Sequence, residues 1–391
     1  MDNNINEKIE KLRGEISEET EKFSTKRIDM SFGELINLYK DGELIIRPQY
    51  QRYFRWKDKQ KTALIESILL SIPIPPIFVA EIENGKWELI DGLQRMSTII
   101  TFFGALKPDN NVIPQNTVTS TFHEIDTIDT DENDRTTNQN NWKLSAGELV
   151  SSLEGLSFTE LPVKFQINLK RAGCRVEILQ EKNSQEMKYE LFKRLNSGGS
   201  KLTAQEIRNA VYRGKNDANI NKLLEGLSKY DAFKKLVTSI LSDKQKIELY
   251  DQELVLRFLA FFIDDDYIGT TEKCLDEFMK KIVNNDDFDI PKYKKVFTAI
   301  FDILDKLNTV NIFKGKNSVF SPTVFDGITV GLAKCLEKGR TPTNELLLSI
   351  INAFKEDSEF NAHRNSSSSY QYRIKNRIER AIQIFEEYTN N

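Results

Sequence analysis

Two kinds of hydrophobic pattern occur in the first half of the chain. Residues 77–83 and 86–90 are rich in β-branched and aromatic side chains, and they are joined by Asn84-Gly85. This pair is typical of type I′ turns, whose two central residues both need positive φ, so we predict a β-hairpin. A further strand is predicted at 175–179 and an extended segment at 44–48, because alternation favours a strand and Pro48 disfavours a helix. Apolar positions three and four residues apart predict helices at 31–39, 58–71, 93–106, 161–170, 184–195 and 203–214. Ser31 with Glu34 and Thr203 with Glu206 predict capping boxes, and Gly42 is expected to end the first of these helices. Residues 5–22 can form a charged helix with little apolar stripe.

The second half shows helical spacing only. From about residue 217 we expect no strand, and the pattern predicts helices at 219–229, 244–263, 271–284, 291–307, 322–338, 343–355 and 367–387. The 391 residues are enough for two or three domains. We predict an α+β protein with a charged arm (1–25), an α/β domain (26–215) and an all-helical domain (216–391). A polar stretch without periodicity, about 108–141, is predicted to be a surface insertion.

Composition narrows the chemistry. The chain has only two histidines, His123 and His363, so a mechanism that needs several imidazoles is nearly excluded. Its three cysteines are isolated and are expected to be reduced thiols. No stretch approaches 18 apolar residues and the N-terminal segment is charged, so we expect a cytoplasmic protein with no membrane partner. The net charge of −4 does not favour binding of a polyanion along the whole chain.

The strongest candidate for a binding site follows the second hairpin strand. That strand leads into Asp91-Gly92 and then a helix, and the start of a helix offers free backbone N–H groups at the positive end of its dipole. Such a place can hold phosphate. Arginine, glutamine and aromatic residues gather here (91–95) and at 47–56, and the planar arginine fork matches phosphate oxygens. An equally weighted alternative is that Asp91 and Arg95 only pair across the helix start, with Tyr50 and Trp56 in the core.

Four ordered motifs resemble a known family. They are Arg47-Pro48-x-Tyr50-Gln51-Arg52-x-x-x-Trp56, the apolar run 64–75 that ends in Ile-Pro-Ile-Pro, Ile90-Asp91-Gly92-x-Gln94-Arg95-x-Ser97-Thr98, and 191–210 with Asn196-Ser197-Gly198-Gly199. Together they are similar to the ParB/sulfiredoxin-like domain with a DGQQR motif that begins GmrSD-type modification-dependent restriction enzymes. The resemblance covers about residues 30–215, apart from the polar insertion.

The resemblance implies a domain that binds and hydrolyses a nucleoside triphosphate, with a divalent cation such as Mg²⁺, as a switch in anti-phage or modified-DNA defence. By position, Asp91, Gly92, Gln94 and Arg95 match the motif. The resemblance implies that Asp91, Gln94 and Arg95 are catalytic and that Gly92 and Arg95 bind the nucleotide. Asp91 would hold the metal ion or position water, and Arg95 would neutralise phosphate charge. The residues that match the facing, nucleotide-binding segment are Tyr50, Gln51 and Arg52, and Asn196 is a further candidate that is equally well explained as part of a helix C-cap.

Two departures from the family pattern limit the carry-over. Leu93 stands where the family has its first glutamine. If that amide orients the attacking water, hydrolysis is lost; if the side chain faces the core, nothing is lost. Full-length relatives also carry an HNH-type nuclease domain, which needs clustered histidines, whereas the C-terminal half here has only His363. We therefore expect any DNA cleavage to need a separate nuclease subunit.

The last predicted helix is basic and could contact a phosphate backbone, although a solvated basic face is the commoner explanation. Its candidate DNA-binding residues are Arg373, Lys375, Arg377 and Arg380.

The leading hypothesis is an NTP-binding and NTP-hydrolysing regulatory subunit of a restriction or anti-phage system that acts on DNA, modified or not. The alternatives are a nucleotide- or DNA-binding regulator without turnover, and a nuclease that uses the ParB-like domain itself. Whether the chain forms a homo-oligomer is left open.

Overall fold

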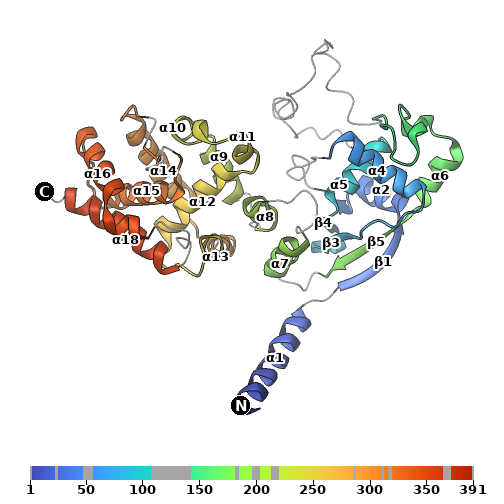
Figure 1. Cartoon of the computed structure of the whole chain (residues 1–391), viewed down its shortest axis with the longest axis horizontal. Coiled ribbons are helices and arrows are strands. Elements are labelled where there is room, and N and C mark those ends of the chain that lie inside the picture. The colour runs from blue at the N-terminus through green and yellow to red at the C-terminus, as the bar shows by residue number, and fades with distance from the viewer. Residues whose placement is uncertain are drawn as a thin grey trace, which may run out of the picture. The chain divides into compact units, whose positions relative to one another are not determined.

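The computed structural model describes most of the chain in two compact units, Met1–Lys201 and Leu202–Asn391 (Figure 1). The division lies earlier than the expected boundary at 215/216, because helix α8 (Ala204–Val211) belongs to the second unit. The class is α+β, as predicted. The described residues are 2–22, 25–46, 56–106, 142–180, 185–195, 203–212, 220–285, 287–309, 312–315, 319–363 and 371–389.

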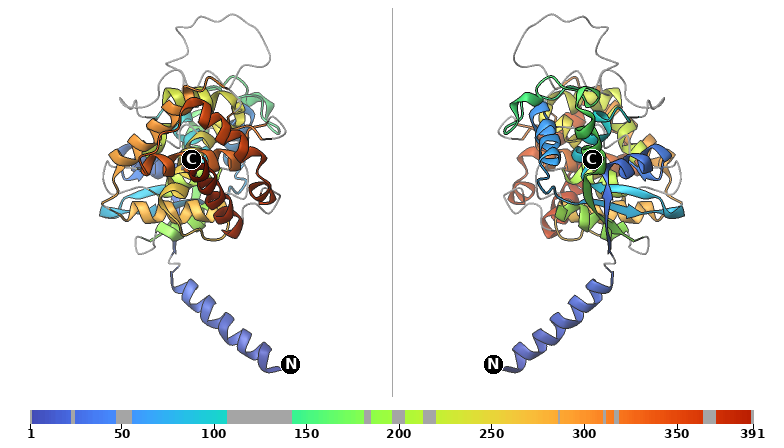
Figure 2. Two further views of the ribbon diagram at one scale, coloured as in Figure 1. Left: turned by 90° about the vertical axis from the view of Figure 1, so that its left-hand side faces the viewer. Right: turned by 90° about the vertical axis from the view of Figure 1, so that its right-hand side faces the viewer.

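The first unit is built on a five-stranded mixed sheet with the order β1-β5-β3-β4-β2. Figure 2 shows the ribbon from two further directions. The pairs β1·β5 and β3·β4 are antiparallel, whereas β3·β5 and β2·β4 are parallel. The parallel pair β3·β5 joins a strand that precedes the predicted insertion (about 108–141) to a strand that follows it. The strands are β1 (Thr25–Ser31), β2 (Leu44–Ile45), β3 (Ile77–Glu81), β4 (Trp87–Asp91) and β5 (Gly173–Leu179).

The predicted hairpin is confirmed as β3 and β4. Asn84 and Gly85 both have positive φ, at 68° and 71°. The connection also includes Glu83 in a short helical turn, Glu83–Gly85, and the N–H of Ile82 donates to the carbonyl oxygen of Lys86 at 2.8 Å. The loop is therefore one residue longer than a two-residue type I′ turn, while the left-handed backbone that favours Asn-Gly is present.

Strand β1 was not predicted. Its residues, Thr25–Ser31, are mostly exposed, and only Ile28 and Met30 provide apolar side chains that pack against the core, which is too short an alternation to predict a strand. It is held by pairing with β5 along its whole length, from Thr25 opposite Leu179 to Ser31 opposite Gly173. An edge strand of this kind is stabilised by the neighbouring backbone rather than by its own hydrophobic pattern.

The helices α2, α4, α5 and α6 gather on one side of the sheet (Figure 1). Their apolar faces meet the sheet in one core, in which Leu35, Ile65, Val79, Ile99 and Val176 are fully buried. Local signals located these helices well: the Ser31 hydroxyl accepts from the N–H of Glu34, and Gly42 ends α2 with φ 77°. The helices of this unit are α1 (Asp2–Lys22), α2 (Phe32–Asp41), α4 (Asp58–Leu69), α5 (Leu93–Phe102), α6 (Val163–Arg171) and α7 (Gln185–Leu195).

The predicted insertion, about 108–141, lies outside the described residues. The chain that follows it is anchored to α4. The Glu66 carboxylate accepts the backbone N–H groups of Glu148, Leu149 and Val150 at 3.2, 2.9 and 2.7 Å. The Thr62 hydroxyl accepts from the N–H of Ser145 at 2.9 Å. A buried carboxylate thus replaces strand pairing in holding this segment against the domain.

The second unit is helical. One predicted helix, 244–263, is two helices in the structure, because Leu249 adopts a left-handed conformation (φ 57°) and ends the first of them. Within this unit, Lys314 and Phe320 form an isolated strand-like bridge. Beyond α8 its helices are α9 (Ile220–Ser228), α10 (Asp231–Leu236), α11 (Asp243–Ile247), α12 (Tyr250–Ile263), α13 (Thr271–Val283), α14 (Ile290–Asp305), α15 (Pro322–Glu337), α16 (Asn344–Glu356), α17 (Ser358–Ala362) and α18 (Gln371–Thr389).

A buried ion pair lies inside this helical core. The Arg257 Nε donates to Asp326 Oδ1 at 2.9 Å, and a second hydrogen bond joins the same two side chains. Both residues are buried next to the phenylalanines of α12, α14 and α15.

None of the helices in the described parts of the chain is long and apolar enough to cross a membrane.

Candidate nucleotide site at the start of helix α5

Gly92 makes the sharp turn between β4 and α5. Its φ is 98°, in the region that L side chains rarely adopt, and a Cβ there would lie 3.1 Å from Ile77 Cγ1. The carbonyl oxygen of Gly92 accepts from the N–H of Met96 at 2.8 Å and closes the first helical turn. Both the backbone angle and the close approach of β3 therefore require glycine.

The N-terminus of α5 has the features of an anion site. Within the described part of the chain, no side chain caps this end of the helix, and its first turn contains no acidic residue. The backbone N–H groups of a helix start and its dipole favour a negative charge. The strand-glycine-helix arrangement predicted from the sequence is thus present.

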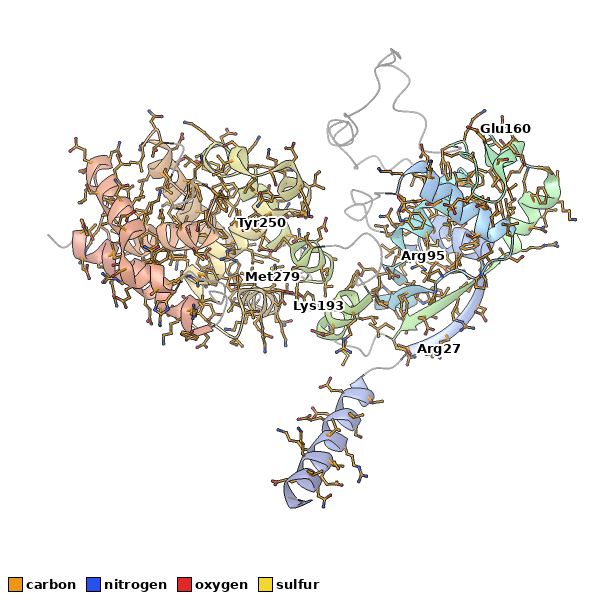
Figure 3. All side chains as sticks on the ribbon, viewed as in Figure 1. Arg27, Arg95, Glu160, Lys193, Tyr250 and Met279 are labelled. Atoms are coloured by element: carbon orange, nitrogen blue, oxygen red, sulfur yellow. The ribbon has the colours of Figure 1, made fainter. Side chains whose placement is uncertain are left out.

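Arg95, labelled in Figure 3, is held in place by protein oxygens. Its Nη2 donates to Asp91 Oδ2 at 2.7 Å, and its Nη1 donates to the carbonyl oxygens of Pro75 and Pro76, the latter at 3.0 Å. The ion pair that the sequence offered as an alternative is therefore formed. The Arg95 side chain is 11% exposed and that of Asp91 is 39% exposed. Arg95 thus ties the 75–76 turn to the helix start, while Asp91 keeps an open side.

Gln94 connects this helix to the other predicted segment. Its Oε1 accepts the backbone N–H of Trp56 at 3.2 Å, and Trp56 is partly buried against the core. The third motif (90–98) therefore contacts Trp56, the last residue of the 47–56 segment. The predicted nucleotide-binding residues Tyr50, Gln51 and Arg52, and the candidate Asn196, lie outside the described residues.

Leu93 is partly buried and packs against the core of the first unit. Of the two cases that the sequence left open for this position, the packing agrees with a side chain that faces the core.

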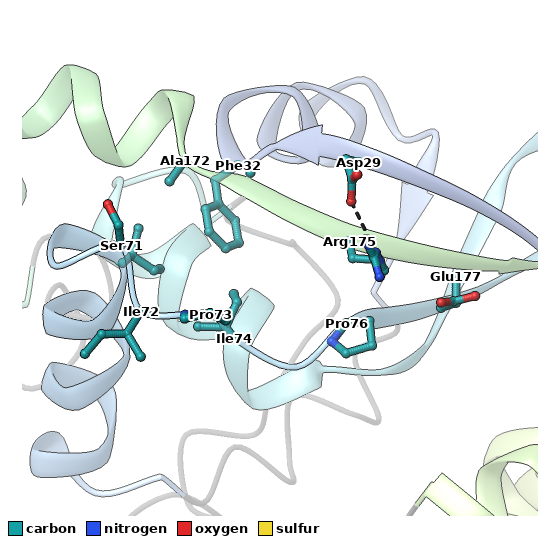
Figure 4. Close-up of a pocket in the computed structure, with 12 residues that line it drawn as sticks. Asp29, Phe32, Ser71, Ile72, Pro73, Ile74, Pro76, Ala172, Arg175 and Glu177 are labelled. Carbon is teal, nitrogen blue, oxygen red and sulfur yellow. Dashed lines mark hydrogen bonds and ion pairs between the residues drawn. The ribbon is translucent and has the colours of Figure 1, made fainter.

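An open pocket of about 520 Å³ is lined by residues of the segment 71–76 and of strands β1 and β5 (Figure 4). Pro76, whose carbonyl oxygen accepts from Arg95, lines it. At its polar side Arg175 Nε lies 3.4 Å from Asp29 Oδ1, across the β1·β5 pair. The sequence did not point to Asp29 because the strand that carries it was not predicted. The other lining residues are Phe32, Ile68, Ser71, Ile72, Pro73, Ile74, Ala172, Gly173 and Glu177.

Asp91 is the predicted metal ligand. No group of three or more histidine, cysteine, aspartate or glutamate side chains that could hold a metal ion occurs among the described residues. A single half-exposed carboxylate fits Mg²⁺ that is held mainly by substrate phosphates and water, which is how Mg²⁺ is commonly bound. Cys174 is not suited to act as a nucleophile, because burial raises the pKa of its thiol to about 11 and keeps the thiol protonated at neutral pH.

The predicted basic face of α18 is interrupted. Arg377 is buried, and its Nη1 donates to the carbonyl oxygen of His363 at 3.2 Å. Arg380 pairs with three carboxylates, of which Asp357 is the nearest at 2.8 Å. Lys375 lies 3.8 Å from Glu379, and Arg373 Nε donates to the hydroxyl of Tyr372 at 2.6 Å. The structure therefore does not bring the four side chains together on one surface.

The polar residues of the fourth motif serve the helical unit. Arg208 is 1% exposed, and its guanidinium lies 2.7 Å from Asp276 and 3.2 Å from Glu253. Asn209 donates to Gln252 Oε1 at 2.7 Å. The capping box predicted at Thr203 and Glu206 is confirmed. The sequence predicted the cap of this helix, but it did not predict the contacts that Arg208 and Asn209 make in the helical unit.

The fold and this site together define an α+β domain with an uncapped helix start behind a glycine, joined in sequence to a helical unit. Residues 32–213 match the family model described as "GmrSD restriction endonuclease, N-terminal domain". The match runs from α2 through α8, and it covers the segment in which the four motifs lie. No curated protein sequence matches the chain.

Proposed function

We propose that this chain binds a nucleoside triphosphate at the start of α5 and regulates a DNA restriction or anti-phage system by hydrolysing it. The observation that carries the proposal is the uncapped start of α5 behind Gly92, which lies inside the segment that matches a restriction endonuclease domain. Backbone N–H groups at such a start hold phosphate without any particular side chain.

In this proposal the residues divide the work. The N–H groups after Gly92 bind phosphate oxygens, and the half-exposed Asp91 carboxylate holds Mg²⁺ that accompanies the phosphates. When bound, the metal ion neutralises phosphate charge. Arg95 is a positioning residue: by binding the Pro75 and Pro76 carbonyls and Asp91, it keeps the carboxylate at the helix start. Gln94 links this site to the 47–56 segment, from which Tyr50, Gln51 and Arg52 are proposed to reach the nucleotide.

We further propose DNA, modified or not, as the partner, and a separate nuclease subunit as the cutting enzyme. The restriction description of the matching family supports DNA. The scarcity of histidines supports a separate nuclease, since an HNH-type centre needs several imidazoles.

A second candidate is nucleotide binding without turnover. It is favoured by one observation: both terminal nitrogens of Arg95 already donate to protein oxygens. An arginine bound in this way stabilises the loop rather than charge that develops during phosphoryl transfer.

Binding and phosphate release measured together distinguish these functions. The samples are the wild type, Asp91→Asn, and the control Asp58→Asn, which removes an exposed aspartate that pairs with Lys61 at 3.0 Å. The proposal expects Mg²⁺-dependent phosphate release in the wild type and the control, and its loss in Asp91→Asn. Binding without release in all three selects the second candidate. Absence of binding by the wild type contradicts both.

A further inference from the structure

Helix α1 carries an apolar seam that the described residues leave exposed. Ile5, Ile9, Leu12 and Ile16 follow one another at spacings of four, three and four residues, which is the a/d pattern of a coiled coil. Their exposed fractions are 57%, 40%, 52% and 57%. Large apolar side chains that line one face of a helix and stay exposed indicate an interaction surface.

The chemistry of α1 favours another helix as the occupant of this seam. Ile9 and Ile16 take the a positions, and Ile5 and Leu12 take the d positions, so the layers contain the aliphatic residues that such seams use. Gly14 lies on the opposite face, where a Cβ would meet nothing within 4 Å. The helix has seven acidic and four basic residues, and this negative balance disfavours an anionic membrane surface.

We propose that α1 pairs with α1 of a second copy of this chain in an antiparallel coiled coil. In this arrangement Ile5 packs opposite Ile16 of the second copy, and Ile9 packs opposite Leu12. The symmetry repeats both layers, so all four apolar residues of each helix are covered. An isologous contact of this kind closes on itself and forms a dimer.

The charges that flank the seam select the orientation. Lys8 and Glu15 occupy the g positions, and Arg13 occupies an e position. Antiparallel helices bring g beside g, so Lys8 of each copy meets Glu15 of the other. Parallel helices bring g beside e, so Lys8 would meet Arg13 twice. Opposite charges at these positions determine partner and orientation in coiled coils, so the antiparallel pairing is favoured.

The first test is the mass of the full-length chain in solution, by sedimentation equilibrium over a range of concentrations. The wild type is expected to form a reversible dimer. Leu12→Glu places a charge in the middle of the seam and is expected to give a monomer at the same concentrations. Because α1 is exposed, this change leaves the rest of the fold intact. A wild-type monomer throughout, or a dimer that Leu12→Glu does not weaken, would overturn the proposal.

The second test uses charge exchange. Lys8→Glu and Glu15→Lys, each alone, are expected to raise the dimer dissociation constant about tenfold, because two exposed pairs change from attraction to repulsion. The double variant is expected to restore the wild-type value. Lys11→Glu makes the same charge change off the seam and is the control; it also removes the exposed 3.8 Å pair with Glu15 inside the helix. If Lys8→Glu tightens the dimer, the helices are parallel and the antiparallel arrangement is wrong.

Discussion

Two arginines from the family motifs differ sharply in what surrounds them. Arg208, in α8, is 1% exposed and lies between Asp276 and Glu253. Arg95, in α5, is 11% exposed, and its acidic partner Asp91 is 39% exposed at an uncapped helix start. Both side chains form ion pairs, yet only the second lies where a ligand could reach the paired carboxylate. The same residue type in a shared motif therefore serves the core in one place and the candidate site in the other.

The difference shows why a motif does not by itself define a site. A buried pair is costly to form and very costly to break, because the remaining charge stays in a low-dielectric environment. A half-exposed pair at a helix start is cheaper to change and can exchange its partner for a ligand. A change at the buried pair of Arg208 should therefore mainly lower stability, whereas a change at the half-exposed pair of Arg95 should mainly lower binding.

The largest effect is expected at Arg208. Arg208→Met leaves Glu253 and Asp276 without their buried cation, and it is expected to lower the free energy of unfolding of the second unit by about 3–5 kcal/mol. Arg194→Met, in which the exposed 3.8 Å pair with Glu190 is lost, is the control and is expected to cost less than about 0.5 kcal/mol. Urea unfolding followed by circular dichroism measures both. Equal small losses would show that the buried pairs of Arg208 do not stabilise the second unit more than an exposed pair does.

The next largest effect is expected at Glu66, the buried carboxylate of the first unit. Glu66→Gln replaces one acceptor oxygen by an NH₂ group that faces backbone N–H donors, and it is expected to cost roughly 1–3 kcal/mol. Asp91→Asn, at the half-exposed carboxylate, is expected to cost less than about 1 kcal/mol. The same unfolding measurement compares them. A larger loss for Asp91→Asn would mean that the ion pair with Arg95 is a structural anchor like the one at Arg208.

A smaller effect is expected at the two left-handed glycines of the β3·β4 hairpin and its exit. Gly92→Ala and Gly85→Ala both put a Cβ at positive φ, each at a cost of about 1 kcal/mol. Gly92→Ala also brings that Cβ to 3.1 Å from Ile77 Cγ1, whereas Gly85→Ala meets nothing within 4 Å. Gly92→Ala is therefore expected to have the lower melting temperature. The reverse order would show that Ile77 yields without cost.

The smallest effect is expected at Leu93. Leu93→Gln restores the family glutamine but removes a partly buried apolar side chain, at a cost of about 1 kcal/mol. Because Leu93 packs against the core, phosphate release is expected to stay at the wild-type rate. A rate that rises severalfold would show that this position orients water, and would make the leucine a cause of low turnover.

The sequence predicted those parts of the fold that depend on local signals. The caps at Ser31, Gly42 and Thr203 and the Asn84-Gly85 turn were predicted correctly, because each acts within a few residues. Strand β1 was missed because its partner β5 lies far away in the sequence, at Gly173–Leu179, so no local signal reports the pairing. The predicted helix at 244–263 is divided because Leu249 has a left-handed backbone conformation, which is not expected for a leucine.

The candidate site was predicted in part for the same reason. Gly92 and the helix start follow from adjacent residues, and Asp91 and Arg95 pair at four residues' distance. The Pro75 and Pro76 carbonyls that hold Arg95 come from another segment and were not foreseen. Burial of Arg377 in α18 was not foreseen either, since a basic side chain on a helix is normally exposed.

Calorimetric titration with each of the four ribonucleoside triphosphates in MgCl₂ tests the central claim most directly. The samples are the wild type, Gly92→Ala and the control Gly85→Ala, which carries the same backbone strain away from the helix start. The account predicts that at least one triphosphate binds the wild type and Gly85→Ala equally well, and binds Gly92→Ala at least about tenfold more weakly, a loss of about 1.4 kcal/mol. Equal affinity of Gly92→Ala and Gly85→Ala, or no binding to the wild type, would contradict it.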